Sequence, residues 1–158
     1  MGKLAGLKIQ AVTSRKDARA MDALDIAVWG SDDPEHHRFF EDFLDSGMRI
    51  YRVMAGAKLA GALVTGYPTS ANLMEVEELM VAHEYRGKGI GMKCLEFARK
   101  EARRRGHEGI VVEVDLKNRH AYEWYGHRGM KVVGHVMVDN EKAWIKEERV
   151  IKAAKTGK

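Results

Sequence analysis

Residues 73–106 read LMEVEELMVAHEYRGKGIGMKCLEFARKEARRRG, and this stretch decides the fold. Its first part, Leu73–Val81, is rich in residues that favour a strand, and the glycine-rich run Arg86–Gly91 follows it. Small and apolar residues then recur at helical spacing at Gly91, Cys94, Leu95, Ala98 and Ala102. Gly106 is a typical C-terminal stop for such a helix. The sequence therefore predicts a strand, a glycine-rich turn and an amphipathic helix, in that order.

The glycine-rich run has the features of a phosphate-binding turn. Unpaired backbone N–H groups at a helix start carry partial positive charge, and glycines let an anion approach them closely. Arg86 and Lys88 add positive charge at the rim. A P-loop does not fit, because Gly87–Lys88 is followed by glycine rather than Ser or Thr, and the third glycine of a dinucleotide fingerprint is missing. From this run alone, a phosphate site and a purely structural turn both remain open.

The run Arg86-Gly87-Lys88-Gly89-Ile90-Gly91 resembles the Arg/Gln-x-x-Gly-x-Gly/Ala signature of the GNAT superfamily of N-acetyltransferases. The similarity extends from Glu75 to Val133, and the first half of the chain is only loosely similar. Its downstream part comprises Val112-Glu113-Val114, Asn118, Ala121, Tyr125 and Gly129-Met130, with Met130 in place of the usual phenylalanine. The resemblance implies a single-domain α+β fold, with a mixed, mostly antiparallel central sheet of about seven strands flanked by about four helices.

The resemblance also implies acetyl-CoA as co-substrate and identifies the residues that would hold it. The glycine run would cradle the pyrophosphate, and the end of the preceding strand would pair with the pantetheine amides. The implied coenzyme-binding residues are Leu79, Met80, Val81, Arg86, Gly87, Lys88, Gly89, Ile90, Gly91, Met92, Asn118 and Tyr125. A backbone N–H near Met80 or Val81 would stabilise the oxyanion. For Asn118, capping of the helix that begins at Arg119 is an equally ordinary role.

Acetyl transfer to an amine needs a general base, because an amine with a pKa near 10.4 is mostly protonated at neutral pH. Glu77 is the first candidate, since it lies where polyamine-type members of the family carry a proposed catalytic Glu. Glu78 is the second candidate and Glu75 the third. Strand alternation places Glu77 and Glu78 on opposite faces unless a bulge intervenes, so a regular strand directs only one of them at a given site. All three could instead be solvent-facing charges.

The departing thiolate needs a proton, and a tyrosine can donate one or hydrogen-bond the sulfur. The resemblance assigns this role to Tyr125, whereas the alternative is a buried aromatic whose hydroxyl bonds to the backbone. Tyr122 and Trp124 are interpreted as packing residues of the same helix. A covalent acyl-enzyme is not expected, because Cys94 falls on the apolar stripe of its helix. No metal site is expected either, since the histidine spacings do not resemble His-Glu-x-x-His.

The other segments predict further elements of one domain over residues 1–158. Strands are expected at residues 8–14, 48–54, 59–65, 110–114, 130–138 and 143–151, although the last segment fits a helix equally well. Helices are expected at 17–29, between Pro34 and Gly47, and at 119–127. The connection Ala55–Lys58 predicts a hairpin. Residues 152–158 are expected to form a flexible basic tail.

The net charge of +4 conceals two segments of opposite sign. Residues 31–45 contain six acidic residues against Arg38 alone, and residues 84–105 contain eight basic residues against three acidic ones. A basic segment suits coenzyme phosphates, and an acidic one suits a cationic amine such as a polyamine, a lysine or peptide amine, or an amino sugar. Both segments could equally be solvated helix faces.

Two other classes of function compete with the enzyme. One is a nucleic-acid or partner-binding module that uses Arg99, Lys100, Arg103, Arg104 and Arg105, which lack the interleaved aromatic residues that stacking on bases needs. The other is an acyl-CoA sensor without turnover. The expected partner is a small-molecule or peptide amine, without a membrane or nucleic acid, and a homodimer is compatible with the sequence. A single cysteine and no apolar run of membrane-spanning length indicate a cytoplasmic protein.

Overall fold

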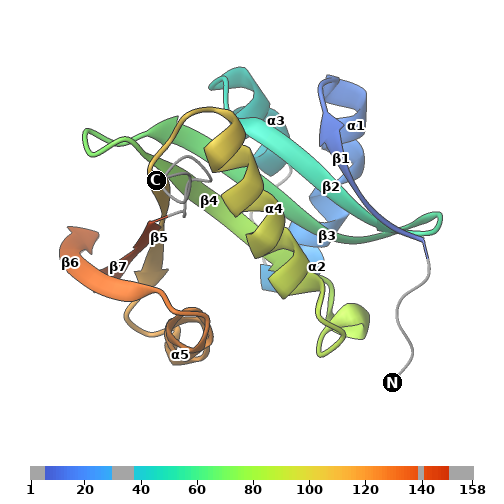
Figure 1. The fold of residues 1–158 in the computed structure, drawn as a ribbon. Coiled ribbons are helices and arrows are strands. Elements are labelled where there is room, and N and C mark those ends of the chain that lie inside the picture. The colour runs from blue at the N-terminus through green and yellow to red at the C-terminus, as the bar shows by residue number, and fades with distance from the viewer. Residues whose placement is uncertain (1–5, 30–37, 139–140, 150–158) are drawn as a thin grey trace. The chain divides into compact units, whose positions relative to one another are not determined.

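The computed structural model describes residues 6–29, 38–138 and 141–149. Its strands are β1 (Leu7–Val12), β2 (Arg49–Ala55), β3 (Lys58–Pro68), β4 (Leu73–Val81), β5 (Gly109–Asp115), β6 (Lys131–Val138) and β7 (Glu141–Arg149). Its helices are α1 (Arg15–Ala20), α2 (Asp22–Trp29), α3 (Phe39–Asp45), the 3-10 helix η2 (His83–Tyr85), α4 (Ile90–Arg104) and α5 (Arg119–His127). The seven strands form one sheet in the order β1-β2-β3-β4-β5-β7-β6, which confirms the predicted α+β fold (Figure 1).

The sheet is mixed, as the resemblance implied. The pairs β1–β2, β2–β3, β5–β7 and β6–β7 are antiparallel, whereas β4 and β5 pair in parallel. Parallel neighbours need a long crossover connection, and the segment between these two strands contains η2 and α4. The glycine-rich run lies in this connection, directly before α4.

By their contacts, the residues form two compact units, and each is described here by itself. The first unit comprises residues 1–66 and 78–97, and the second comprises residues 67–77 and 98–158. Both β4 and α4 therefore contribute residues to each unit. A single domain over residues 1–158 remains a prediction.

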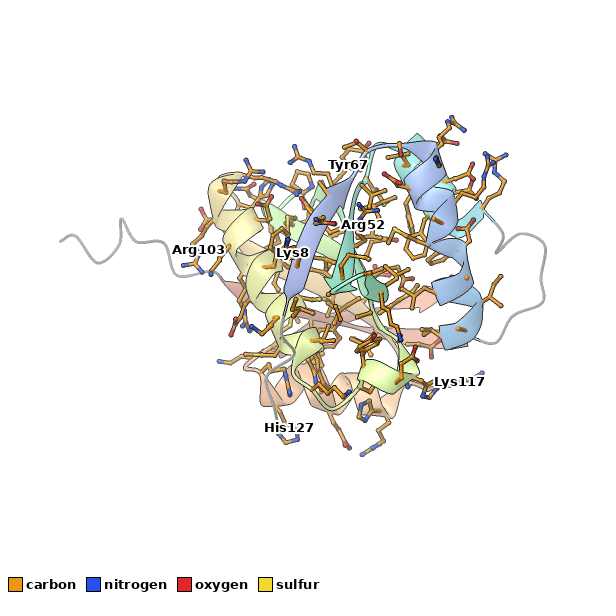
Figure 2. The ribbon with its side chains drawn as sticks, turned by 90° about the vertical axis from the view of Figure 1, so that its right-hand side faces the viewer. Lys8, Arg52, Tyr67, Arg103, Lys117 and His127 are labelled. Atoms are coloured by element: carbon orange, nitrogen blue, oxygen red, sulfur yellow. The ribbon has the colours of Figure 1, made fainter. Side chains whose placement is uncertain are left out.

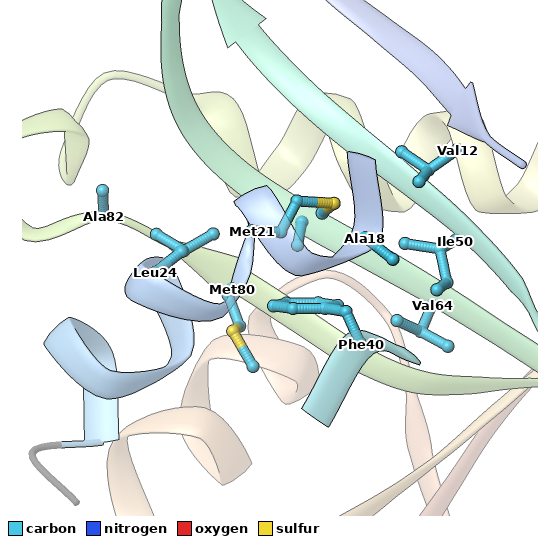
Figure 3. Packing of buried hydrophobic residues seen from close by; sticks show 10 residues of the cluster. Val12, Ala18, Met21, Leu24, Phe40, Ile50, Val64, Met80 and Ala82 are labelled. Carbon is cyan, nitrogen blue, oxygen red and sulfur yellow. The ribbon is translucent and has the colours of Figure 1, made fainter. Parts of the chain in front are cut away.

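In the first unit, apolar residues of the strands pack with residues of α1, α2 and α3. Figure 3 shows Phe40 of α3 among side chains from the strands and from α1 and α2. The fully buried members of this cluster include Ala18, Met21, Phe40, Ile50 and Val64. A second cluster joins Val53 and Ala60 to Ile90 and Cys94 of α4, so the sheet of this unit carries two apolar layers.

The prediction of one continuous helix over 17–29 is wrong, because the structure has two helices, α1 and α2, in this segment. Ser14 caps α1 by accepting a 3.1 Å hydrogen bond from the Asp17 N–H, so the helix begins two residues earlier than expected. At Met21 the chain closes α1 with a bond to the Ala18 carbonyl, and α2 begins at the next residue. Met21 itself is 1% exposed, so the break lets a large apolar side chain enter the core. The helix expected after Pro34 is present as α3, while Pro34 lies outside the described residues.

In the second unit, β7 is the middle strand between β5 and β6. Its register places Lys146 opposite Val112 of β5 and opposite Val132 of β6. The segment 143–151, for which a helix was equally compatible, is therefore a strand as far as Arg149. The residues 152–158, predicted to form a tail, lie outside the described residues.

Candidate active site

The three carboxylates predicted as candidate bases lie on β4. Glu75 is half-buried, Glu77 is exposed and Glu78 is half-buried. Although Glu77 is an exposed residue, partial burial of its carboxyl group raises its pKa, and the charges of Glu75 and Glu113 raise the pKa further. A raised carboxyl pKa lies closer to neutral pH, where a general base works best.

Glu113 was not among the predicted site residues. It lies on β5, and β4 and β5 pair in parallel with Glu75 opposite Val111. Two residues further along each strand come Glu77 and Glu113, whose charges interact. Only the register between the two strands could have identified this pair, because the two residues are 36 positions apart in the sequence.

The end of β4 in the first unit is fixed by apolar contacts of its side chains. Met80 is 2% exposed and packs in the cluster that contains Phe40, while Leu79 and Val81 pack against the cluster of Ile90 and Cys94. Neighbouring residues of β4 thus face different apolar layers, as strand alternation requires. The same alternation places Glu78 on the face of Met80.

The main chain at Met80 approaches β3 unusually closely. A Cβ added to Gly61 would overlap the Met80 carbonyl oxygen, and the next atoms it would meet also belong to the β4 backbone. Glycine is thus required at this interior position of β3, a known sign of close backbone approach. Gly61 is a second residue that the sequence reasoning missed, although a glycine inside a predicted strand was the available signal.

The glycine-rich run forms an exposed turn in the first unit. Gly87 and Gly89 adopt positive φ values of 74° and 82°, which residues with a Cβ rarely adopt. A Cβ added at either glycine would meet no described atom within 4 Å, so space is left above this turn. The α4 helix begins directly after Gly89, and its first residue, Ile90, is 1% exposed. Open space beside the N–H groups of a helix start fits the binding of a diphosphate.

Two cationic side chains border this turn. Arg86 donates from Nε to the Val81 carbonyl oxygen over 3.2 Å, which joins the turn to the end of β4. This bond uses only Nε, so the terminal nitrogens of this exposed side chain are the ones that could meet a phosphate. The Lys88 ammonium lies 5.6 Å from the centre of the Tyr85 ring. Both residues remain predicted phosphate ligands.

In the second unit, α5 carries Asn118 at its start and Tyr125 in its last turn. The Asn118 Oδ1 accepts a 3.1 Å hydrogen bond from the Ala121 N–H, so Asn118 is the N-cap of α5. Only its Nδ2 could then donate to a coenzyme. Tyr125 is 9% exposed, and its ring meets that of Trp124 edge-on with centroids 5.0 Å apart. The catalytic role of Tyr125 and the coenzyme contact of Asn118 stay predictions.

Cys94 does not have the properties of a nucleophile. It is fully buried in the apolar cluster beneath the turn, and burial raises the pKa of its thiol to about 12. The reactive thiolate is therefore scarce at neutral pH. Among the described residues, no group of three His, Cys, Asp or Glu side chains could hold a metal ion.

The acidic residues of α3 are paired with arginines of the same unit. The Arg19 guanidinium donates to Glu41 over 2.7 Å and lowers the pKa of that carboxyl, and Arg15 lies 2.6 Å from Asp45. A cavity of about 320 Å³ is lined by Arg15, Arg19, Arg38 and Glu41. Much of the negative charge that α3 contributes to the predicted acidic segment is thus paired with arginines of the same unit.

Basic residues at the end of α4 and directly after it also make contacts within the second unit. Arg99 donates to the Arg128 carbonyl oxygen over 3.1 Å, and Arg104 and Arg105 both bond to Glu101. Figure 2 shows Arg103 directed outward from its helix. The pairing of Arg99, Arg104 and Arg105 within this unit weakens the case for a nucleic-acid surface here.

The open turn at the start of α4 follows a strand that carries carboxylates, which is the arrangement that the resemblance implied. The sequence profile of the Acetyltransferase (GNAT) family matches residues 17–130. The chain therefore belongs to the acetyltransferase (GNAT) family, which confirms the resemblance. Its fold is also that of a crystal structure of aminoglycoside 6'-N-acetyltransferase complexed with coenzyme A, with a TM-score of 0.77 and 16% identity over 91% of this chain and 97% of that one.

Two curated relatives are similar in sequence. Streptothricin acetyltransferase of Escherichia coli is 30% identical over 94 residues, which are 60% of this chain and 53% of that protein. Aminoalkylphosphonate N-acetyltransferase of Salmonella typhimurium is 37% identical over 57 residues, which are 36% of this chain and 37% of that protein. The chain thus spans about half or less of the length of these relatives. Among the described residues, no helix has the length and apolar character to cross a membrane.

Proposed function

We propose that this protein is an N-acetyltransferase that moves an acetyl group from acetyl-CoA to a primary amine. The observation that carries the proposal is the open turn formed by Gly87 and Gly89 at the start of α4. Membership of the acetyltransferase family supports the proposal, and so does the likeness in fold to an enzyme crystallised with coenzyme A. The open space beside Gly87 and Gly89 would let an anion approach the backbone N–H groups of the turn.

The chain's own groups would bind and orient the co-substrate in two places. The turn, with Arg86 and Lys88 at its rim, would hold the diphosphate by backbone N–H groups and positive charge. A backbone N–H near Met80 or Val81 would donate to the carbonyl oxygen that becomes negatively charged. When bound, acetyl-CoA supplies an acetyl thioester that an unprotonated amine can attack.

Glu77 is the proposed base that removes a proton from the attacking amine. Its carboxylate stands beside those of Glu75 and Glu113, which raise its affinity for a proton. Glu78 is the second candidate, because alternation gives it the opposite face of the same strand. Tyr125 is the proposed acid, whose hydroxyl would donate a proton or a hydrogen bond to the departing sulfur.

The proposed acceptor is a cationic amine, of the polyamine, lysine or peptide amine, or amino-sugar type. Three carboxylates, those of Glu75, Glu77 and Glu113, interact in the second unit and would attract a cation to the base. These three carboxylates support a cationic acceptor better than the acidic residues of α3 do, because Glu41 and Asp45 are paired with arginines. Enzymes named for streptothricin and aminoglycoside acetylation among the similar proteins are consistent with amine acceptors.

Turnover of acetyl-CoA with a panel of amines, followed by release of free thiol, tests the proposal. The panel should contain polyamines, lysine and lysine peptides, amino sugars, a neutral amine and an acidic amine. Thiol release that depends on a cationic amine is expected, and a preference for neutral or acidic amines would contradict the acceptor class. Calorimetry with acetyl-CoA separates the alternatives: binding without turnover indicates a sensor, and no binding indicates a partner-binding module.

A further inference from the structure

Lys146 is a buried lysine that the proposed reaction does not use. It lies in β7, the middle strand of the β5–β7–β6 sheet, and is only 2% exposed. Val112 and Val132 stand opposite it on the two neighbouring strands. Lysines are rarely buried to this extent without a partner, because removing an ammonium ion from water is unfavourable. The contacts of this side chain therefore call for an explanation.

The partners of Lys146 belong to α5. Its Nζ donates a 2.6 Å hydrogen bond to the Tyr122 carbonyl oxygen and lies 3.8 Å from the centre of the Tyr122 ring. Burial lowers the pKa of Lys146. Among the described residues no ion pair with a carboxylate compensates the charge, so the ammonium is held by a backbone oxygen and an aromatic face.

Gly126, one turn further along α5, leaves room for this ammonium. A Cβ at Gly126 would lie 3.3 Å from the Lys146 Nζ, which is tighter than an ordinary contact. Gly126 does not adopt a positive φ, so the demand for a small residue comes from the lysine rather than from the backbone. Tyr122 and Gly126 together bracket Tyr125, the residue proposed as the acid.

We propose that Lys146 is a positioning residue that fixes the turn of α5 on which Tyr125 is carried. The ammonium donates a hydrogen bond to the Tyr122 carbonyl, three residues before Tyr125, and lies where a side chain at Gly126, the residue after Tyr125, would meet it. From the other side, the Tyr125 carbonyl accepts hydrogen bonds from the Arg128 and Met130 N–H groups. The turn is thus restrained on both sides, so that the Tyr125 ring keeps one orientation.

This inference rests on the proposed role of Tyr125, and the experiment separates the two. Lys146→Met keeps an unbranched side chain, one atom shorter than that of lysine, and removes its charge. We expect kcat to fall about tenfold or more, with KM for acetyl-CoA changed less than about threefold, because a misdirected acid slows chemistry rather than binding. Lys58→Met, at an exposed position of the β2–β3 hairpin, is the matched control and should change neither constant.

A double-mutant cycle gives the decisive result. In the Tyr125→Phe background, Lys146→Met should lower kcat less than about twofold, since the group that it positions is already absent. If Tyr125→Phe itself leaves kcat unchanged, the proposed role of Tyr125 fails. If Tyr125→Phe lowers kcat while Lys146→Met lowers only the melting temperature, Lys146 is merely structural and the present inference alone is overturned.

Gly126→Ala provides a second route should Lys146→Met not fold. This variant keeps the lysine and crowds its ammonium, so kcat should fall about threefold with a melting temperature within a few degrees of the parent. The NMR signals of the Tyr125 ring, assigned by comparison with Tyr125→Phe, should shift in the free protein. Unchanged ring signals together with unchanged kcat in Gly126→Ala would overturn the inference.

Discussion

The turn at the start of α4 and the last turn of α5 are built in different ways. The first uses backbone: Gly87 and Gly89 adopt positive φ, and open space lies above both. The second uses side chains: Tyr125 is restrained by its neighbours in α5, and the buried Lys146 reaches the same helix from β7. The residues of a backbone-built site can be identified from the local sequence. A site built from side chains depends also on residues of distant strands, such as Lys146 of β7, that contact the helix.

The largest expected effect is a loss of kcat when the proposed base is replaced. Glu77→Gln should lower kcat by about 100-fold or more, because a general base contributes about 10²–10⁴ to the rate. The raised pKa means that the ionised carboxylate disfavours the folded state at neutral pH, so the melting temperature should not fall. Steady-state kinetics and thermal unfolding measure both quantities.

Glu78→Gln is the matched control on the same strand. It should retain most of the activity if Glu77 is the base. Loss of turnover in Glu78→Gln, with Glu77→Gln fully active, would transfer the role of base to Glu78.

The next effect concerns the backbone-built turn. Gly89→Ala forces a residue with a Cβ into φ of 82°, which costs about 1–2 kcal/mol, or shifts the turn away from its binding geometry. The Kd for acetyl-CoA should therefore rise about tenfold, with kcat at saturation changed little. Calorimetry and steady-state kinetics measure these two quantities.

Gly106→Ala separates strain from binding. Gly106 has the same φ of 82° and the same open space, but it follows the C-terminal end of α4. This variant should lower the melting temperature and leave the Kd for acetyl-CoA unchanged. Equal loss of binding in both variants would show that the turn acts through stability alone.

A smaller effect is expected from Glu113→Gln. The Glu113 charge raises the pKa of Glu77, so its removal lowers that pKa and leaves the base unprotonated at lower pH. The acidic limb of the profile of kcat/KM against pH should move towards lower pH. A limb unmoved by Glu113→Gln would remove Glu113 from the site.

The smallest effect is expected from Cys94→Ala, which should keep turnover within about twofold. Cys94 lies beneath the turn, and with a thiol pKa of about 12 it has almost no thiolate at neutral pH. Alkylation of the native protein should accordingly be slow, as mass spectrometry can measure. Abolished turnover in a folded Cys94→Ala protein would contradict direct transfer to the amine.

Much of the fold could be predicted where the signal is local. The bounds of β4 and α5 match the predicted ranges, and Gly106 ends α4 as expected, because strand propensity, an N-cap and a helix stop are short-range features. The break at Met21 could not be predicted, since the apolar pattern of 17–29 continues across it. The break accompanies the burial of the Met21 side chain in the core, which the local sequence pattern does not indicate.

The candidate site divides in the same way. The glycine run and the asparagine before α5 were identified from the sequence, although the structure shows Asn118 as an N-cap. Glu113 and Lys146 were missed because their importance arises from strand register and from contacts across the sheet. The ion pairs of Glu41 and Asp45 in α3 could not be predicted either, since their partners Arg19 and Arg15 belong to a different helix.

Gly61 has a consequence for how this protein can vary. Its position opposite the Met80 carbonyl admits no side chain, so even alanine requires β3 and β4 to separate. A saturation screen for activity would therefore rank Gly61 with the residues that perform chemistry, although it has no chemical group to offer. Intolerance to substitution at this position would report the spacing of two strands, and a search for catalytic residues based on such a screen should set it aside.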